Sequence, residues 1–220
     1  MLTFLFWLFC VAALYSYFIY PLVLRVLVAK KGVKTSATTE SSSMAVSVSL
    51  IVTAYNEESR VRAKIENSLQ LEFDASAFEI IVASDCSSDR TDDIVREYAD
   101  RGVRLVRAPE RLGKEHAQQC AIKEASGEIL VFSDVATEIP ADAIKKLVAY
   151  FNDPNVGAVS SEDRFISQNG TVAGEGAYVK YEMWLRQQES RLAGLVGLSG
   201  SFFAVRKSLC SDWDIHSPSD

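Results

Sequence analysis

The feature that most constrains the fold is an alternation of β-branched runs with amphipathic segments between residues 46 and 160. The runs predict strands, and the segments between them repeat apolar residues at the three- or four-residue spacing of a helix packed on one face. Strands that alternate with helices of about ten to fifteen residues are typical of a mostly parallel sheet with right-handed crossovers. We therefore predict a Rossmann-like α/β domain. The predicted strands are 46–53, 78–84, 103–107, 128–133 and 156–160, and the predicted helices are 57–69, 89–100, 114–125, 140–151 and 176–192.

The strand predicted at 128–133 contains an unbroken apolar run and stops abruptly at Asp134. Such a run suits a strand buried on both faces. An acid at its end lies in the crevice beyond the carboxyl ends of the strands, where open α/β sheets bind ligands. Asp134 is equally suited to cap the segment that follows, because Asp is a favoured N-cap and Pro140 indicates a helix start nearby. From this stretch alone both interpretations stay open.

Composition limits the classes of partner. The chain has 220 residues, of which 48% are hydrophobic and 24% charged, which suits one ordinary domain with an appendage. A net charge of −6 without a long basic block argues against a nucleic-acid partner, because phosphate backbones need clustered Lys and Arg. The four cysteines are far apart and the chain has only two histidines, so we expect reduced thiols and no structural zinc site.

The N-terminal stretch from Leu2 to Leu24 contains no charged residue. A helix of that length just crosses a hydrocarbon core of roughly 30 Å, so we predict a transmembrane or interfacial helix over 1–29, with a kink at Pro21. A cleaved signal peptide is the alternative, but no Lys or Arg precedes the run, which is also longer than a usual signal core.

The residues that follow this stretch set its orientation. Basic residues at 25, 30, 31 and 34 lie on its C-terminal side, so the positive-inside rule places the rest of the chain in the cytoplasm. Residues 30–45 form a basic flank and a Ser/Thr-rich linker that cannot build a core. The soluble domain is predicted over 46–220.

Polar and aromatic side chains follow the ends of three predicted strands. Thr53, Tyr55 and Glu57 follow the first, Asp85 the second and Asp134 the fourth, and parallel topology brings these ends to one rim. Asp85 suits a hydrogen bond from a base or ribose, and Tyr55 offers a face for stacking. Each could singly belong to an ordinary turn, but together they predict a nucleotide site. No GxGxxG follows the first strand and no GxxxxGK[ST] occurs, which excludes the usual nicotinamide and P-loop phosphate cradles.

Two blocks carry a family resemblance. Residues 48–57, VSLIVTAYNE, and residues 79–91, EIIVASDCSSDRT, resemble the opening blocks of family 2 inverting glycosyltransferases. The aromatic, Pro-containing segment 17–21 resembles that of membrane-bound polysaccharide or glycolipid members. Further similar blocks follow in order at 111–117, 129–137, 156–161 and 200–206.

The resemblance implies a glycosyltransferase A-type nucleotide-sugar domain. Such an enzyme passes a sugar from a nucleotide-diphosphate donor to a hydroxyl of a polysaccharide or lipid-linked acceptor, with inversion at the anomeric carbon. Asp134 corresponds to the first acid of the family's DxD motif, which binds Mg²⁺ or Mn²⁺ at the diphosphate. By the family pattern, the nucleotide-sugar-binding residues are Thr53, Tyr55, Glu57, Asp85, Lys114 and Asp134.

Two features depart from the family pattern. Ala136 stands where many members have a second Asp or an Asn, so the motif offers one carboxylate and we expect weaker metal affinity. Asp220 falls where the family has its catalytic base, but it is the last residue, and terminal residues are usually mobile. We therefore interpret the chain as the N-terminal part of a longer protein. Asp212 and Asp214 are weaker candidates for the base, since each is expected to be a solvated loop acid.

Ala136 and the abrupt end also favour a second hypothesis, a non-catalytic nucleotide-binding or assembly module that keeps the fold. Asp85, Lys114 and Asp134 favour the enzyme. A nucleotidyltransferase ranks last, because no Gly-rich basic loop follows the first predicted strand.

Overall fold

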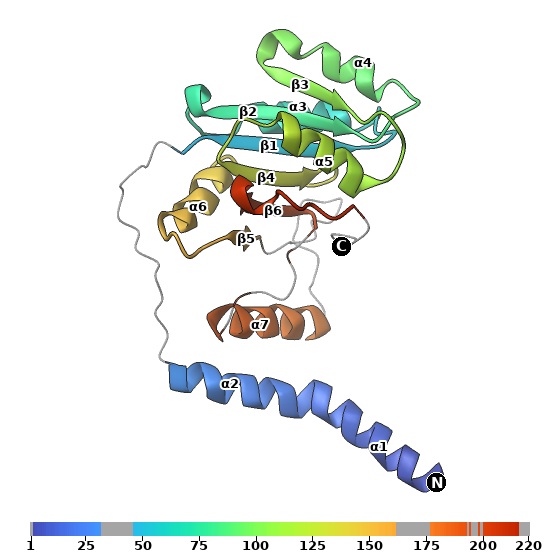
Figure 1. Ribbon diagram of the computed structural model, residues 1–220, viewed down its shortest axis with the longest axis vertical. Coiled ribbons are helices and arrows are strands. Elements are labelled where there is room, and N and C mark those ends of the chain that lie inside the picture. The colour runs from blue at the N-terminus through green and yellow to red at the C-terminus, as the bar shows by residue number, and fades with distance from the viewer. Residues whose placement is uncertain are drawn as a thin grey trace. The chain divides into compact units, whose positions relative to one another are not determined.

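The computed structural model describes residues 2–31, 46–161, 177–192, 194, 198 and 200–215. The chain divides into two compact units. The larger one carries the sheet and its helices, and the smaller one is helical (Figure 1). The smaller unit comprises Met1–Thr38 and Arg164–Gly197, and the larger comprises Thr39–Asp163 and Leu198–Asp220.

Within the described residues of the larger unit, six strands form one sheet in the order β3-β2-β1-β4-β6-β5. The first four strands in this order run parallel, whereas β6 pairs antiparallel with both β4 and β5. The predicted α/β class with a mostly parallel sheet is therefore confirmed, and the inserted strand β6 was not predicted. The strands are β1 (Val48–Ala54), β2 (Phe78–Ser84), β3 (Val103–Arg107), β4 (Ile129–Asp134), β5 (Ala158–Ser160) and β6 (Phe202–Arg206).

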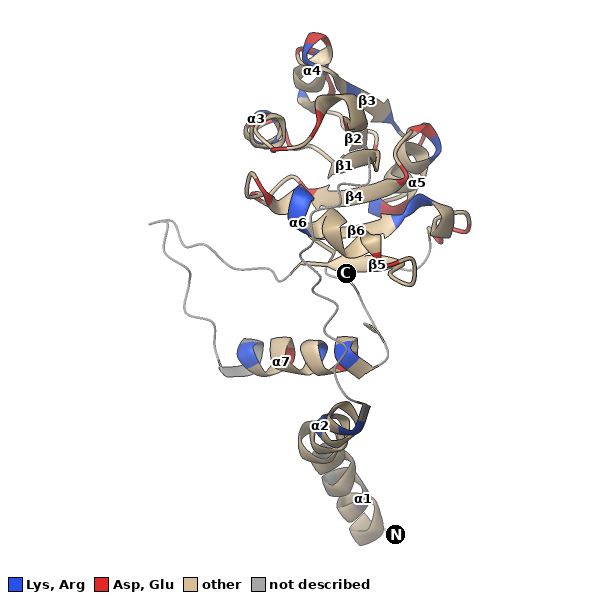
Figure 2. Ribbon diagram, turned by 90° about the vertical axis from the view of Figure 1, so that its left-hand side faces the viewer, with Lys and Arg blue, Asp and Glu red and all other residues tan. Residues whose placement is uncertain are grey.

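Helices cover both faces of this sheet, because the central strands are apolar on both sides. Alternate residues of β1 point in opposite directions: Leu50 and Val52 pack into one apolar cluster and Ile51 into the other. Figure 2 shows α3 and α6 on one side of the sheet and α5 on the other. The helices of this unit are α3 (Val61–Leu69), α4 (Thr91–Arg96), α5 (Lys114–Glu124) and α6 (Ala143–Ala149).

These helices are shorter than the sequence patterns predicted. The predicted helix 57–69 begins only at Val61. Before it the chain forms a turn, in which the Arg60 amide bonds to the Glu57 carbonyl three residues earlier. Elsewhere, tighter single turns take up part of the predicted helices or adjoin strands. These are η2 (Ala75–Ala77), η3 (Ala99–Arg101), η4 (Tyr150–Asn152) and η5 (Lys207–Leu209).

Aromatic stacking packs the segment after β6, through Trp213, against the sheet. The ring of Phe132 on β4 lies 4.8 Å from that of Phe203 on β6 and 5.0 Å from that of Trp213, measured between ring centroids. Both pairs are nearly parallel, an arrangement that adds to the burial of apolar area.

In the smaller unit, Pro21 alters the helix around it. Proline has no backbone N–H, so the Tyr17 carbonyl four residues earlier loses its usual donor. The chain widens to a π-helical turn, in which the Tyr20 amide bonds to the Tyr15 carbonyl, and the Tyr181 hydroxyl donates to the Tyr17 carbonyl at 3.1 Å. The helices of this unit are α1 (Leu2–Leu14), η1 (Tyr15–Ile19), α2 (Tyr20–Lys31) and α7 (Ala177–Leu192).

Contacts between α2 and α7 join the two sequence segments of the smaller unit. The Tyr20 hydroxyl donates to Glu189 Oε1 at 2.7 Å, and Leu24 and Val28 are buried. No helix within the described residues is both long enough and apolar enough to cross a membrane. The membrane helix over 1–29 stays a prediction.

Candidate functional site

A cavity of about 310 Å³ opens at the carboxyl ends of β1, β2 and β4. This volume lies at the lower end of the range typical of small-molecule sites. All six residues predicted to bind a nucleotide-sugar line this cavity. The lining residues are Thr53, Ala54, Tyr55, Glu57, Asp85, Lys114, Asp134, Val135 and Ala136.

The register of the sheet explains why residues distant in sequence meet here. β1 lies between β2 and β4 and runs parallel to both, with Thr53 beside Asp134 and Ala54 beside Ser84. Because all three strands end at the same edge, the residue that follows Ser84, Asp85, reaches the same cavity. The predicted convergence of strand ends is confirmed, and the roles of the individual residues stay predictions.

Lys114 and Asp134 form an ion pair inside the cavity, with 3.0 Å between Nζ and Oδ1. Lys114 is the first residue of α5, and it also donates to the Gly200 carbonyl at 3.1 Å. Helix α6 begins at Ala143 with Asp142 at its N-cap position, so Asp134 does not start that helix. Of the two interpretations of Asp134, the structure favours the one that directs it toward a ligand cavity.

Asp85 lies under the loop that leads into α5. It is 5% exposed, and its Oδ1 accepts from the Gly113 amide at 3.3 Å. Gly113 has a φ of +105°, a conformation that L side chains rarely adopt. A residue with a Cβ at this position would therefore strain the turn that places Lys114 opposite Asp134.

The ring of Tyr55 is already covered on one face. The guanidinium carbon of Arg111, an exposed residue, lies 3.9 Å from the ring centroid, a cation–π arrangement. A base that stacked on that face would have to displace Arg111, whereas one on the other face would extend the stack. The covering by Arg111 was not predicted.

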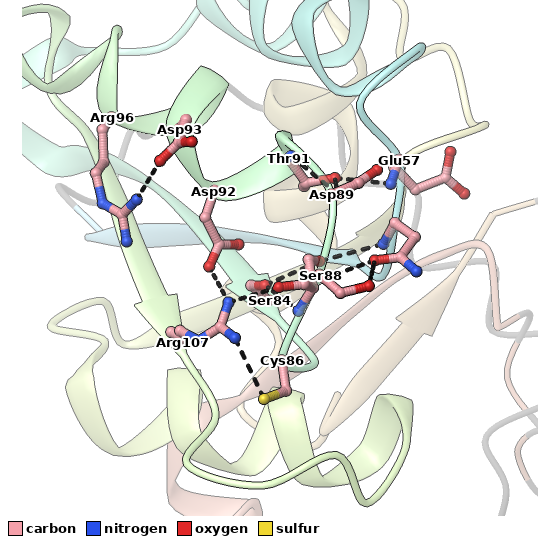
Figure 3. Close-up of polar contacts among 12 residues, drawn as sticks. Glu57, Ser84, Cys86, Ser88, Asp89, Thr91, Asp92, Asp93, Arg96 and Arg107 are labelled. Atoms are coloured by element: carbon pink, nitrogen blue, oxygen red, sulfur yellow. Dashed lines mark hydrogen bonds and ion pairs between the residues drawn. The ribbon is translucent and has the colours of Figure 1, made fainter.

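The loop after β1 and the loop after β2 hold each other through side chains (Figure 3). The Asn56 side-chain oxygen accepts from the Ser88 amide at 2.8 Å, so Asn56 bridges the two loops instead of capping its own helix. Asn56 and Cys86 both have positive φ, 52° and 59°, which is uncommon for residues other than glycine. Further bridges run from the Asn56 amide to Ser87 Oγ at 3.2 Å, from Ser88 Oγ to Asn56 Oδ1 at 3.3 Å, from the Glu57 amide to Thr91 Oγ1 at 2.8 Å, from the Glu58 amide to Asp89 Oδ2 at 3.0 Å and from the Arg90 amide to Glu58 Oε2 at 3.1 Å.

Arg107, at the end of β3, supports the second loop from below. It donates to the Ser87 carbonyl at 2.9 Å. Figure 3 shows its bonds to Cys86 Sγ, at 3.3 Å, and to the Asp92 carboxylate. The hydrogen bond from Arg107 to Asp92 raises the pKa of the guanidinium further above its usual value. Its charge therefore stays fixed beside Asp92 and the Ser87 carbonyl.

Two buried polar residues near the cavity were missed from the sequence. Lys64 on α3 is 3% exposed and Gln118 on α5 is 1% exposed. Gln118 donates to Thr53 Oγ1 at 3.3 Å, and its Oε1 has no hydrogen-bond partner among the described residues. A signal was present for Lys64, because it lies three residues after Val61 and one before Ile65, within the apolar face of α3.

A metal site at the cavity would rest on one carboxylate. Among the described residues, no group of three or more His, Cys, Asp or Glu side chains could hold a metal ion. Asp134 nevertheless fits a divalent cation, because Mg²⁺ is commonly held by one or two carboxylates together with substrate phosphates and water. Its carboxylate lies in the cavity wall beside Ala136, which offers no second oxygen.

The predicted catalytic base cannot be placed. Asp220 lies outside the described residues, which end at 215. The weaker candidates Asp212 and Asp214 are both exposed, and neither is among the residues lining the cavity.

Comparison with known proteins agrees with this geometry. A protein named poly-beta-1,6-N-acetyl-D-glucosamine synthase, from Staphylococcus epidermidis, is 30% identical over 175 residues, which are 76% of this chain and 42% of that protein. A beta-monoglucosyldiacylglycerol synthase from Trichormus variabilis is 28% identical over 176 residues, 76% of this chain and 38% of its own length. The chain thus spans about two fifths of the length of these curated relatives.

Solved structures have the same fold. A mannosyltransferase from Pyrobaculum calidifontis, solved in complex with GDP-Man and Mn²⁺, superimposes with a TM-score of 0.74 at 26% identity, covering 91% of this chain and 56% of its own. TarS from S. aureus gives a TM-score of 0.55 at 22% identity, over 79% of this chain and 51% of that one, and supports the fold alone. Residues 49–213 match the family described as Glycosyl transferase family 2, and the chain belongs to that family.

Proposed function

We propose that this chain carries the donor-binding half of a membrane-associated glycosyltransferase, which moves a sugar from a nucleotide-diphosphate donor to a hydroxyl of a polysaccharide or lipid-linked acceptor with inversion. One observation carries the proposal: in a family 2 chain, the six predicted donor-binding residues surround one cavity that contains the Lys114–Asp134 pair.

Different residues of the cavity would bind different parts of the nucleotide-sugar. Asp85, buried and anchored to the Gly113 amide, presents its second oxygen to a ribose or base, and Tyr55 offers a ring face. Lys114 holds a positive charge where the diphosphate would lie, and its bond to the Gly200 carbonyl keeps it there. When bound at Asp134, a divalent cation would supply further positive charge for the diphosphate that leaves.

The proposal also covers the acceptor of the sugar. An acceptor hydroxyl needs a base that takes its proton on the side opposite the leaving group, and Asp220 is the proposed base. The names of the two curated relatives refer to a diacylglycerol and to a polysaccharide. We propose an acceptor of one of these two classes.

Membrane association belongs to the same proposal. The α1 side chains Leu2, Phe4 and Phe9 are each 70% exposed or more, whereas a water-exposed helix normally carries polar residues. The basic residues that follow favour a cytoplasmic transferase domain. Sedimentation with vesicles of neutral phospholipid tests this part, and a chain that lacks residues 1–29 should stay in the supernatant.

Nucleotide titration tests the donor site. We expect UDP or GDP to bind the detergent-solubilised 220-residue chain, with affinity rising about tenfold when Mn²⁺ is present, which corresponds to about 1.4 kcal/mol. If neither nucleotide binds with or without Mn²⁺, the proposed donor site is wrong.

The second candidate function is a non-catalytic nucleotide-binding or assembly module, and Ala136 is the observation that favours it. Release of nucleoside diphosphate from GDP-mannose, UDP-glucose or UDP-N-acetylglucosamine distinguishes the two. The assay needs a chain long enough to include the residues that the relatives have beyond this match. Tight nucleotide binding without any release or transfer would select the module.

A further inference from the structure

Lys64 is a lysine in an unusual place. It lies on α3 beneath the end of β4 and is 3% exposed, although lysine is almost never fully buried unless it is paired. Burial lowers the pKa of Lys64 to about 7, and the negative charge of Asp134 partly opposes this effect. The ammonium group therefore lies in the field of the carboxylate that faces the cavity.

Its contacts lie on both sides of Asp134 in the sequence. Lys64 Nζ donates to Ser133 Oγ at 2.7 Å and to the Thr137 carbonyl at 2.5 Å. Neighbouring residues of a strand point to opposite faces, so Ser133 meets Lys64 on the α3 side while Asp134 meets Lys114 on the α5 side. The two lysines approach the end of β4 from opposite faces of the sheet.

The rest of the turn depends on backbone contacts. The Asp134 amide bonds to the Ser201 carbonyl at 3.1 Å, and the Thr137 amide bonds to the Asp134 carbonyl at 3.2 Å. Lys64 joins Ser133, the residue before this turn, to Thr137, its last residue. Without it, the half-buried Thr137 carbonyl and the buried Ser133 hydroxyl would each lose a hydrogen-bond donor.

A second residue of α3, Asn67, holds the same region through uncharged hydrogen bonds. The Asn67 side chain both donates to the Ile139 carbonyl and accepts from the Ile139 amide, each at 2.9 Å. It anchors the same β4–α6 loop with two hydrogen bonds and no charge, further from Asp134. An apolar or amide side chain usually serves stability better than a buried ammonium group, which is costly to desolvate.

We infer that Lys64 is a positioning residue, whose bonds to Ser133 and Thr137 fix the turn so that the Asp134 carboxylate is held toward the donor diphosphate and its cation. This inference rests on the proposed function. It names a role for a residue that does not line the cavity and acts only through the shape of the turn.

The test compares variants that remove equal numbers of hydrogen bonds from one loop. Lys64→Met keeps the length of the side chain but cannot donate, and Asn67→Ala is the matched control. For each variant of the 220-residue chain, UDP and GDP are titrated with and without Mn²⁺, and the urea midpoint is measured. For Lys64→Met, we expect the Mn²⁺-dependent gain in nucleotide affinity to be lost, with affinity in the absence of Mn²⁺ unchanged. For Asn67→Ala, we expect the gain to persist although stability falls.

The sign of the effect distinguishes positioning from simple electrostatics. Removing a buried positive charge near Asp134 would by itself strengthen cation binding, so a larger Mn²⁺-dependent gain in Lys64→Met would overturn the inference. An unchanged gain, or equal losses in Lys64→Met and Asn67→Ala, would overturn it as well.

A further variant covers the case in which Lys64→Met does not fold. Ser133→Ala removes one of the two acceptors and leaves the lysine in place, and we expect it to lower the Mn²⁺-dependent gain by a few fold. An unchanged gain in Ser133→Ala would then decide against the inference. If the unsubstituted chain binds neither nucleotide, the proposed function fails, and this outcome is distinct from failure of the inference.

Discussion

The two ends of the parallel sheet are built in opposite ways. At the amino ends of the strands, the Glu79 carboxylate accepts from Ser49 Oγ at 2.6 Å, from the Ser126 amide and hydroxyl at 2.6 and 2.8 Å and from Arg104 at 2.8 Å. Every contact joins one strand to its neighbour or to the turn before β4. Glu79 thus links β1, β2, β3 and the turn before β4 at this end of the sheet.

The carboxyl ends keep polar groups turned toward a cavity. Asp85 and Asp134 face the space, two residues other than glycine have positive φ, and a lysine is buried beneath. Strain and buried charge persist only where the surroundings hold them in place, and they are concentrated at functional sites. The comparison indicates that the amino end supplies stability and the carboxyl end supplies chemistry.

The largest effect should come from the carboxyl end. Asp134→Asn removes the one carboxylate proposed to hold the metal. In a chain long enough for the turnover assay, we expect donor turnover to fall by at least about a hundredfold, as when one key electrostatic group is lost. The unfolding midpoint should hardly change, because the Lys114–Asp134 pair is partly exposed. Asp142→Asn, which removes a surface carboxylate paired with Lys146, is the control and should retain turnover. Equal loss in both variants would contradict the division between the ends.

Gly127 tests the amino end. A Cβ at this position would meet the backbone nitrogen of Ser49 at 2.5 Å, and backbone cannot move aside easily. We expect Gly127→Ala to lower the free energy of unfolding by about 2 kcal/mol, measured by urea denaturation, without changing nucleotide affinity in the folded protein. The control is Gly157→Ala, whose Cβ would meet only the end of the exposed Leu209 side chain. A similar loss in the control would mean that the close packing at Gly127 is not the cause.

The loss of stability at acid pH should also depend on the amino ends of the strands, through the Glu79 carboxylate. Burial alone would raise the pKa of Glu79, but the hydrogen bonds from Ser49, Ser126 and Arg104 outweigh it and lower the pKa from 4.5 to about 2. A carboxylate with a lowered folded-state pKa stabilises the fold above its unfolded pKa, and this contribution is lost as the pH falls from 4.5 toward 2.

Glu79→Gln removes this titration. Its urea midpoint should be lower than that of the unsubstituted chain at neutral pH and should vary less across the acid window. The reference is Glu72→Gln, which removes an exposed carboxylate paired with Lys145. If Glu79→Gln and the unsubstituted chain lose stability in parallel below pH 4.5, the hydrogen-bond network does not carry the effect.

The smallest effect concerns strain at the carboxyl end. Cys86 has a φ of 59°, and glycine adopts this conformation without strain, so Cys86→Gly should raise the free energy of unfolding by about 0.5 kcal/mol. The hydrogen bond that it removes, from Arg107 to Cys86 Sγ, ends on sulfur, a weak acceptor. Asn56→Gly relieves similar strain but removes the acceptor of the Ser88 amide, and it should lower stability instead. Thermal unfolding of both variants measures the difference, and a gain in Asn56→Gly would mean that the bridge between the loops contributes little.

Sequence patterns predicted the parts of the fold in which one chemical property dominates. The β-branched and apolar runs of β1, β2 and β4 predicted buried strands, and the polar residues that follow them predicted one shared rim. Strand β6 was not predicted, because its place between β4 and β5 depends on pairing with segments distant in sequence, and a local sequence pattern does not indicate such pairing. The start of α3 was predicted four residues too early, because residues 57–60 form a turn and not the first turn of the helix.

The sequence predicted the residues that line the candidate site, but it did not predict the residues that hold those residues in place. Thr53, Asp85 and Asp134 carry chemistry that can be recognised from residue type and position at a strand end. Lys64 and Arg107 act through what they touch, and a lysine within a helix is ordinarily expected to face water. Lys64 owes its role to its burial within the apolar face of α3, whereas Arg107 is exposed and owes its role to its contacts with Cys86, Ser87 and Asp92.

The late position of β6 in the chain has a consequence for how the protein is made. Strand β4 gains its second neighbour only when Phe202–Arg206 has been synthesised, so until then the apolar run Ile129–Phe132 forms an open sheet edge. Such an edge readily pairs with other chains, and exposed edges make folding intermediates prone to aggregate. The addition of β6 covers this edge, and the residue just before it supplies the Ser201 carbonyl that accepts from the Asp134 amide. The segment that shields β4 from other chains therefore also holds the backbone of a residue in the cavity wall.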